Sequence, residues 1–210
     1  MQIENILFDL DGTLIDSAEG IQFAIESAVA SVLPDRQIPN LKLFIGPPVR
    51  KILEQILPDV RSEVLDKIIR QFREIYDEYG WKKSILYENA RETIEYLNRQ
   101  NIKTWIVTNK PNIPTIKTIN HLEINHLFTK IFSLDSQVPH FQSKKEMVEF
   151  LMQEYKLNPS TTLLVGDSKD DAIAANSNGL HFTWASYGYG TLAQSNSSTI
   201  TELSQLKSLL

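Results

Sequence analysis

Several features that define common protein classes are missing from this 210-residue sequence. It has no cysteine, which excludes disulfide bonds, zinc–thiolate sites and cysteine nucleophiles. Its four histidines show no spacing typical of metal ligands. No apolar run approaches the roughly 18 residues that a membrane-spanning helix needs, so no membrane partner is expected. The formal net charge is −5 without a long basic run, which disfavours nucleic acid as a partner.

We expect no signal peptide, because the first residues do not form a basic stretch followed by an apolar stretch. We therefore expect a soluble, cytoplasmic protein. The composition, with 42% hydrophobic and 22% charged residues, is ordinary for a globular chain. The length allows one core with a smaller inserted unit. The sequence does not indicate an oligomeric state.

Residues 17–80 carry only helical patterns. Apolar side chains recur every three to four residues in three successive segments, which begin near Ser17, Val49 and Val64. Prolines separate the segments, and Ser17 is the expected N-cap of the first helix. This block therefore contains no predicted strand.

In the rest of the chain, short apolar segments alternate with helical patterns. We expect strands at 3–8, 103–107, 129–133, 161–165 and 180–184, and helices at 89–100, 113–121, 143–155 and 169–178. This alternation is typical of a parallel sheet with helices on both faces. The sequence thus predicts an α/β fold with a five-stranded parallel, Rossmann-like core made of residues 1–15 and 86–210. Residues 16–85 form an inserted α-helical cap, and residues 194–198 form a polar loop before a short C-terminal helix.

Polar residues follow the predicted strands. Ligands of open parallel sheets bind beyond the carboxyl ends of the strands, so these residues are the candidates for a site. They are Asp9, Asp11, Thr108, Asn109, Asp167 and Asp171, with Lys144 and Lys145 at the start of the helix after the third strand. Clustered carboxylates repel one another unless a cation lies among them, and their hard oxygen atoms suit Mg²⁺. A lysine and a hydroxyl beside such a cation would suit a phosphate group.

Four segments together resemble the motifs of the haloacid dehalogenase superfamily. The first is residues 8–14 (Phe-Asp-Leu-Asp-Gly-Thr-Leu), the second is Thr108, the third is Lys144 and the fourth is residues 166–171. A helical insertion directly after the first motif resembles the helical cap class of that family. Within it, residues 44–48 resemble the cap loop of phosphoglycolate phosphatase-like members.

This resemblance implies a role for each candidate residue. Asp9 would attack phosphorus and form an aspartyl-phosphate, and Asp11 would protonate the leaving oxygen and then activate water. Mg²⁺ would be bound by a carboxylate oxygen of Asp9, the backbone carbonyl of Asp11, and Asp167. Thr108 and Lys144 would hold the phosphoryl group that is transferred.

Other assignments stay open at this point. Lys145 competes with Lys144 for the phosphate, although Lys144 fits the motif better. Asp171 would support either the metal site or Lys144, without binding the substrate itself. Asn109, at the end of the second strand, is added to the substrate-binding set. Arg50, one turn into the second helix of the insertion, would contact a second anionic group of the substrate, or would be a solvated helix residue.

The implied function is a Mg²⁺-dependent phosphatase that acts on a small phosphate monoester, with phosphoglycolate as the first guess. A 5'-nucleotidase, a pyrophosphatase and a sugar phosphomutase remain alternatives within the superfamily. Asp11 argues against a dehalogenase or a phosphonate hydrolase, because these enzymes lack or replace the second aspartate. A non-enzymatic binding module is the alternative from another class, and it predicts the loss of a catalytic motif, whereas all four are present.

Overall fold

The computed structural model describes residues 2–41, 44–46, 48–191 and 198–209. The chain divides into two compact units. One consists of Met1–Asp16 and Leu86–Leu210, and is called the α/β unit. The other is Ser17–Ile85, and is called the helical unit.

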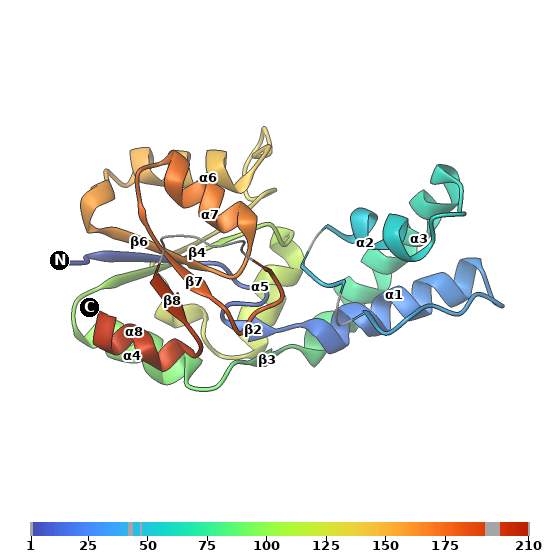
Figure 1. The fold of residues 1–210 in the computed structure, drawn as a ribbon, viewed down its shortest axis with the longest axis horizontal. Coiled ribbons are helices and arrows are strands. Elements are labelled where there is room, and N and C mark those ends of the chain that lie inside the picture. The colour runs from blue at the N-terminus through green and yellow to red at the C-terminus, as the bar shows by residue number, and fades with distance from the viewer. Residues whose placement is uncertain (1, 42–43, 47, 192–197, 210) are drawn as a thin grey trace. The chain divides into compact units, whose positions relative to one another are not determined.

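A parallel sheet forms the centre of the α/β unit, with its strands in the order β5-β4-β1-β6-β7-β8 (Figure 1). The strands are β1 Asn5–Phe8, β4 Lys103–Thr108, β5 Lys130–Ser133, β6 Thr162–Gly166, β7 His181–Ala185 and β8 Ser198–Ile200. The predicted α/β fold with a parallel sheet is confirmed, but the predicted number of five strands is wrong because β8 is a sixth. Residues 194–197 of the predicted polar loop lie outside the described residues.

Strand β1 lies between β4 and β6, and all four of its residues are buried. Its last residue, Phe8, is paired with Ile106 of β4 and with Val165 of β6. This register brings the carboxyl ends of the three central strands to the same edge. The residues that follow Phe8 and Val165 therefore emerge close to the end of β4.

Helices cover both faces of the sheet (Figure 1). They are α4 Ala90–Arg99, α5 Asn112–His121, α6 Lys144–Glu154, α7 Lys169–Ser177 and α8 Leu206–Leu209. Ile6 and Phe8 pack in one apolar cluster with α4, α5 and α8, while Leu7 packs in a second cluster with α6 and α7. The alternation of side chains along β1 thus gives the sheet one core on each face.

The helical unit contains α1 Ala18–Val32, α2 Val49–Ile56 and α3 Ser62–Glu78, followed by a short 3₁₀ helix, Gly80–Lys83. Ser17 occupies the N-cap position of α1, but its side chain makes no capping hydrogen bond. Two short strands that the sequence did not reveal, β2 Ile15–Asp16 and β3 Ile85–Leu86, pair with each other. Across the described ranges, none of the helices has the length and apolar character needed to cross a bilayer. The cytoplasmic location stays a prediction.

Candidate active site

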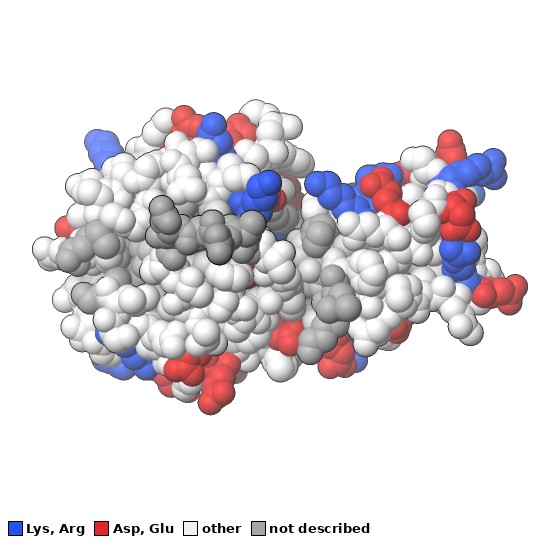
Figure 2. Space-filling model, in the orientation of Figure 1, with Lys and Arg blue, Asp and Glu red and all other residues white. Residues whose placement is uncertain are grey.

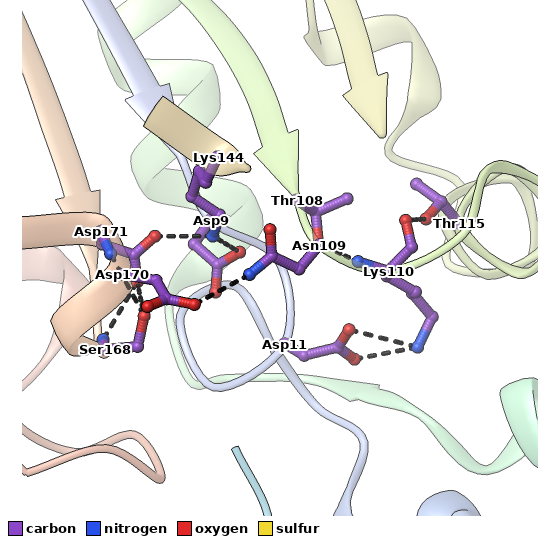
Figure 3. Close-up of polar contacts among 10 residues, drawn as sticks. All are labelled: Asp9, Asp11, Thr108, Asn109, Lys110, Thr115, Lys144, Ser168, Asp170 and Asp171. Carbon is purple, nitrogen blue, oxygen red and sulfur yellow. Dashed lines mark hydrogen bonds and ion pairs between the residues drawn. The ribbon is translucent and has the colours of Figure 1, made fainter. Parts of the chain in front are cut away.

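The carboxyl edge of the central strands gathers most of the predicted site residues, and Figure 3 draws Asp9, Asp11, Thr108, Asn109, Lys144 and Asp171 there. Asp9 follows β1, Thr108 ends β4 and Asp167 follows β6. Lys144 is the first residue of α6, and Asp171 lies in the first turn of α7. Segments that are far apart in the sequence therefore meet at one edge of the sheet.

Lys144 carries a buried ammonium group that bridges two carboxylates. Its Nζ lies 2.6 Å from Oδ1 of Asp9 and 2.6 Å from Oδ1 of Asp171, and only 3% of the lysine side chain is exposed. Burial lowers the pKa of Lys144, but the carboxylates of Asp171 and Asp9 outweigh it and raise the pKa above its ordinary value. Lys144 is therefore held in its charged form. Lys145 is exposed, so it is Lys144 that the fold brings to the cluster.

Asp171 fixes the lysine from the start of α7. Its Oδ2 accepts hydrogen bonds from the backbone N of Ser168 at 3.0 Å and from the Ser168 hydroxyl at 2.5 Å. The backbone N of Asp171 donates to the Ser168 hydroxyl in return, which completes a capping box. With Oδ1 on Lys144, both carboxylate oxygens have partners. Of the two supporting roles left open for Asp171, this geometry favours the positioning of Lys144.

Asp9 is a buried carboxylate in an environment of excess negative charge. Burial raises the pKa of Asp9 well above its ordinary range, Lys144 opposes that rise, and the carboxylates of Asp171 and Asp167 add to it. One oxygen atom each from Asp9, Asp167 and Asp171 lie within 4.8 Å of one another. Three carboxylates face one ammonium here, so the cluster has the donor atoms and the charge that suit a divalent cation.

The carboxylate of Asp167 is oriented by the chain that follows β7. Its Oδ2 accepts hydrogen bonds from the backbone N of Tyr189 at 2.7 Å and of Gly190 at 3.0 Å, and the Trp184 indole donates to its backbone oxygen at 3.1 Å. The pKa of Asp167 is raised to about 6, mainly by burial and then by the Asp171 carboxylate, while the two amides oppose the rise. These two bonds fix Oδ2 and leave Oδ1 available to a cation.

Gly12 allows the first motif to pass directly beside Asp167. Its φ is +85°, in the left-handed region, and a Cβ at this position would lie 2.3 Å from Oδ2 of Asp167. Any other residue would both strain the backbone and collide with the carboxylate. The turn that begins at Asp11 therefore needs glycine for conformation and for space.

Asp11 is paired with Lys110, a site residue that the sequence analysis missed. The Nζ of Lys110 lies 3.0 Å and 3.2 Å from the two carboxylate oxygens of Asp11, and the lysine side chain is 6% exposed. The Asp11 carboxylate points toward this lysine and away from Asp9 and Lys144 (Figure 3). Lys110 comes two residues after the end of β4, and this place at the carboxyl edge is the signal that could have identified it.

The loop after β4 brings Thr108 and Asn109 to the same edge. Thr108 is 1% exposed, and its hydroxyl oxygen accepts a hydrogen bond from the backbone N of Lys110 at 3.1 Å. The side-chain amide of Asn109 donates to Oδ2 of Asp170 at 3.4 Å, which ties this loop to the start of α7. The hydroxyl hydrogen of Thr108 is not used in accepting, so it can be directed at a phosphate oxygen.

Arg50 lies in α2 of the helical unit. Its guanidinium donates to the carboxylate of Asp66 in α3 and lies 3.9 Å from that of Glu54. The arginine side chain is 43% exposed. Within its own unit Arg50 thus binds carboxylates, and its contact with a substrate stays a prediction.

Comparison with known proteins identifies relatives over nearly the whole chain. Residues 6–185 match the sequence model of a family described as haloacid dehalogenase-like hydrolase. The chain is 29% identical to a phosphoglycolate phosphatase of Vibrio vulnificus (strain YJ016), with 90% of this chain and 86% of that protein aligned. It is 27% identical to a 5'-nucleotidase of Pseudomonas aeruginosa, with 91% and 86% aligned. The crystal structure of a predicted phosphoglycolate phosphatase from Haemophilus somnus 129pt superposes with a TM-score of 0.86 at 26% identity, covering 100% of this chain and 98% of that one.

Proposed function

Since this chain belongs to the haloacid dehalogenase-like hydrolase family and is a phosphatase that acts on phosphate esters, we propose that it hydrolyses a small phosphate monoester through an aspartyl-phosphate on Asp9. The contact of buried Lys144 with Asp9 and Asp171, at 2.6 Å each, carries the proposal. A carboxylate beside a fixed ammonium is suited to attack a phosphorus atom whose oxygens the same ammonium holds.

The site residues fit Mg²⁺ as the cofactor of this reaction. Asp9, Asp167 and the backbone carbonyl of Asp11 would hold the ion, because all three offer hard oxygen atoms and the buried carboxylates outnumber the lysine charge. When bound, Mg²⁺ would supply positive charge that offsets the repulsion between the attacking carboxylate and the phosphoryl oxygens.

In the first step, a carboxylate oxygen of Asp9 forms a bond to phosphorus while the bond from phosphorus to the leaving oxygen breaks. Asp11 gives its proton to that leaving oxygen. An ammonium has three N–H donors, and in Lys144 two of them face Asp9 and Asp171, so we assign the third to a phosphoryl oxygen. The Thr108 hydroxyl holds another phosphoryl oxygen. Lys110 positions the carboxyl group of Asp11.

In the second step, a water molecule attacks phosphorus and gives a proton to Asp11, and the bond between phosphorus and Asp9 breaks. Inorganic phosphate and the free Asp9 carboxylate result. Lys144 keeps its contact with the phosphoryl oxygens in both steps. Asp171 and Ser168 do not touch the phosphate in this scheme, because their hydrogen bonds serve to position Lys144.

Turnover of p-nitrophenyl phosphate tests the reaction and its cofactor. We expect phosphate release in the presence of Mg²⁺, loss of release in EDTA, and recovery when Mg²⁺ is added back. Acid quenching during turnover of a radiolabelled ester should leave label on the peptide that contains Asp9. Activity in saturating EDTA would contradict the cofactor proposal, and label on another peptide would contradict the nucleophile.

Phosphoglycolate is the substrate that we propose first, because the Vibrio vulnificus relative and the Haemophilus somnus structure carry that name. A 5'-nucleoside monophosphate is the second candidate, because the Pseudomonas aeruginosa relative is named a 5'-nucleotidase. Values of kcat/KM for both, with pyrophosphate and sugar phosphates included, would rank them. For the sugar phosphates, release of free phosphate indicates hydrolysis, whereas a phosphomutase would move the phosphate within the sugar and release none.

Arg50 is the residue that we propose for the carboxylate of phosphoglycolate. A guanidinium can make two parallel hydrogen bonds to a carboxylate, so the substrate would replace or share the contact with Asp66. Arg50→Ala should lower kcat/KM for phosphoglycolate by about 10- to 100-fold. Turnover of p-nitrophenyl phosphate should stay unchanged, because it has no carboxylate. Lys51→Ala, at the exposed neighbouring position, is the control, and equal losses on both substrates would contradict this role.

A further inference from the structure

The chain directly after β7 contacts the site although it belongs to none of the four motifs. The backbone N atoms of Tyr189 and Gly190 donate to Oδ2 of Asp167 at 2.7 Å and 3.0 Å. The hydroxyl of Tyr189 donates to Oδ1 of Asp16 at 2.7 Å. Tyr189 thus touches the proposed metal ligand through its backbone, and through its side chain it touches the last residue before the helical unit.

A second tyrosine holds the same segment against the first motif. The hydroxyl of Tyr187 donates to the backbone oxygen of Thr13 at 2.8 Å. Burial raises the pKa of Tyr187, so its hydroxyl stays protonated and remains a donor. Its ring packs edge-on against that of Tyr87 with the centroids 4.9 Å apart, and the backbone N of Tyr87 donates to Leu14 at 3.0 Å. The segment is therefore anchored next to β2 and β3, where the chain leaves and re-enters the α/β unit.

Gly190 lets this backbone approach Asp167 closely. A Cβ at position 190 would lie 2.2 Å from the backbone oxygen of Asp167 and 3.0 Å from the Cα of Ser168. These are backbone atoms, which cannot rotate aside as a side chain can. An alanine at this position must therefore push the two amides away from the Asp167 carboxylate.

We propose that Tyr189 and Gly190 are positioning residues for the cation. Their amides hold Oδ2 of Asp167 and direct Oδ1 toward the ion, and the Tyr189 hydroxyl ties this arrangement to Asp16. The inference rests on the proposed cation site at Asp9 and Asp167. Groups that hydrogen-bond a metal ligand set its orientation, and their loss typically costs about 10- to 100-fold in affinity. The affinity for Mg²⁺ thus depends on a hydroxyl group that contacts neither the ion nor its ligand.

Binding of Mg²⁺ to the purified full chain measures this dependence without any substrate. The Kd comes from calorimetry, and the rise in Tm on adding MgCl₂ after EDTA treatment gives an independent readout. Tyr189→Phe should raise the Kd by about 3- to 10-fold, and Gly190→Ala by about 10- to 100-fold. Tyr155→Phe is the matched control, because this ring packs against Trp105 on the other face of the sheet, and it should keep the wild-type Kd.

Asp167→Asn separates the inference from the cation site on which it rests. If the wild-type chain does not bind Mg²⁺, or if Asp167→Asn binds it as well as the wild type, the cation site is wrong and the inference falls with it. If Asp167→Asn loses binding while Tyr189→Phe keeps the wild-type Kd, only the positioning role is overturned. If Gly190→Ala fails to fold, the Kd of Tyr189→Phe alone still tests the positioning role. A Tm that falls equally with and without Mg²⁺, at an unchanged Kd, would also overturn it.

Discussion

One ion pair in each unit shows the contrast between exposed and buried charges. In the helical unit, Lys83 and Glu19 pair at 2.7 Å with 37% and 74% of their side chains exposed. In the α/β unit, Lys144 and Asp9 pair at 2.6 Å with 3% and 8% exposed. Acidic and basic side chains lie interspersed over the surface that Figure 2 shows, whereas the charges of the site are buried at the sheet edge.

Exposed and buried ion pairs differ in their effect on the free energy of unfolding. An exposed pair contributes about 0–1 kcal/mol, because water screens it and two flexible side chains must be ordered. A buried pair must repay a large desolvation cost, and removing one partner costs about 3–5 kcal/mol because the other charge is left uncompensated. Apolar residues of similar size often stabilise a core as well or better. The buried cluster is therefore explained by the reaction and not by the fold.

The largest effect is expected at Asp9, the proposed nucleophile. Asp9→Asn keeps the size of the side chain but removes the attacking charge, so kcat should fall by at least about 10³-fold. Turnover of p-nitrophenyl phosphate measures the loss, and circular dichroism checks the fold. Asp35→Asn, at an exposed carboxylate of the helical unit, should keep wild-type turnover. Near-normal activity of folded Asp9→Asn would refute the aspartyl-phosphate mechanism.

Replacing the buried lysine should damage both activity and stability. Lys144→Met leaves Asp9 and Asp171 without their common partner, so the free energy of unfolding should fall by about 3–5 kcal/mol. The value of kcat should fall by at least about 10²-fold. Lys145→Met, at the exposed neighbour, should change stability by no more than about 0.5 kcal/mol. Urea unfolding measures the loss of stability, and turnover measures the loss of kcat. Equal losses in Lys144→Met and Lys145→Met would contradict the special role of the buried lysine.

A smaller and more selective effect is expected at Lys110. If this residue acts through Asp11, Lys110→Met should lower kcat/KM for phosphoglycolate by about 10- to 100-fold. The loss with p-nitrophenyl phosphate should be smaller, because p-nitrophenolate leaves without needing a proton. Lys130→Met, at an exposed lysine of β5, is the matched control. Equal losses on the two substrates would show that Lys110 does not act through Asp11.

The smallest effect is expected at the exposed pair of the helical unit. Glu19→Gln removes its charge beside Lys83 and should change the free energy of unfolding by no more than about 1 kcal/mol. Urea unfolding at low and high salt measures this change, which should shrink as salt increases. A loss as large as that of Lys144→Met would contradict the comparison between the two units.

Local patterns in the sequence were sufficient for most of the fold. The central strands are apolar runs buried on both faces, which is why their positions and the α/β class could be predicted. Strand β8 could not, because it has three residues, of which Ser198 and Thr199 are exposed. Its pairing with Thr183–Ala185 of β7 comes from tertiary contact and not from a local preference for strand.

The sequence likewise predicted some of the site residues and missed others. Asp9 and Asp167 could be proposed because each follows a strand directly, and the carboxyl ends of parallel strands share one edge. Lys110 was missed because it lies in a bend two residues after the end of β4, where the sequence does not show which way a side chain points. Tyr189 contributes a backbone N–H to the site, and nearly every residue type has that group. No pattern of side chains could have revealed it.

The central place of β1 has a consequence for the order in which the molecule assembles during synthesis. Asn5 pairs with Lys103 on one side and with Thr162 on the other. The strand that precedes the proposed nucleophile Asp9 can therefore pair fully only after both partner strands have been synthesised. The helical unit lies between β1 and both partner strands in the sequence, and its local contacts can form earlier, because short loops close at lower entropic cost. The amides that hold Asp167 are made later still, at residues 189 and 190. A nascent chain that has passed Asp171 but has not reached Tyr189 therefore carries all four motifs without the two amides that hold Asp167.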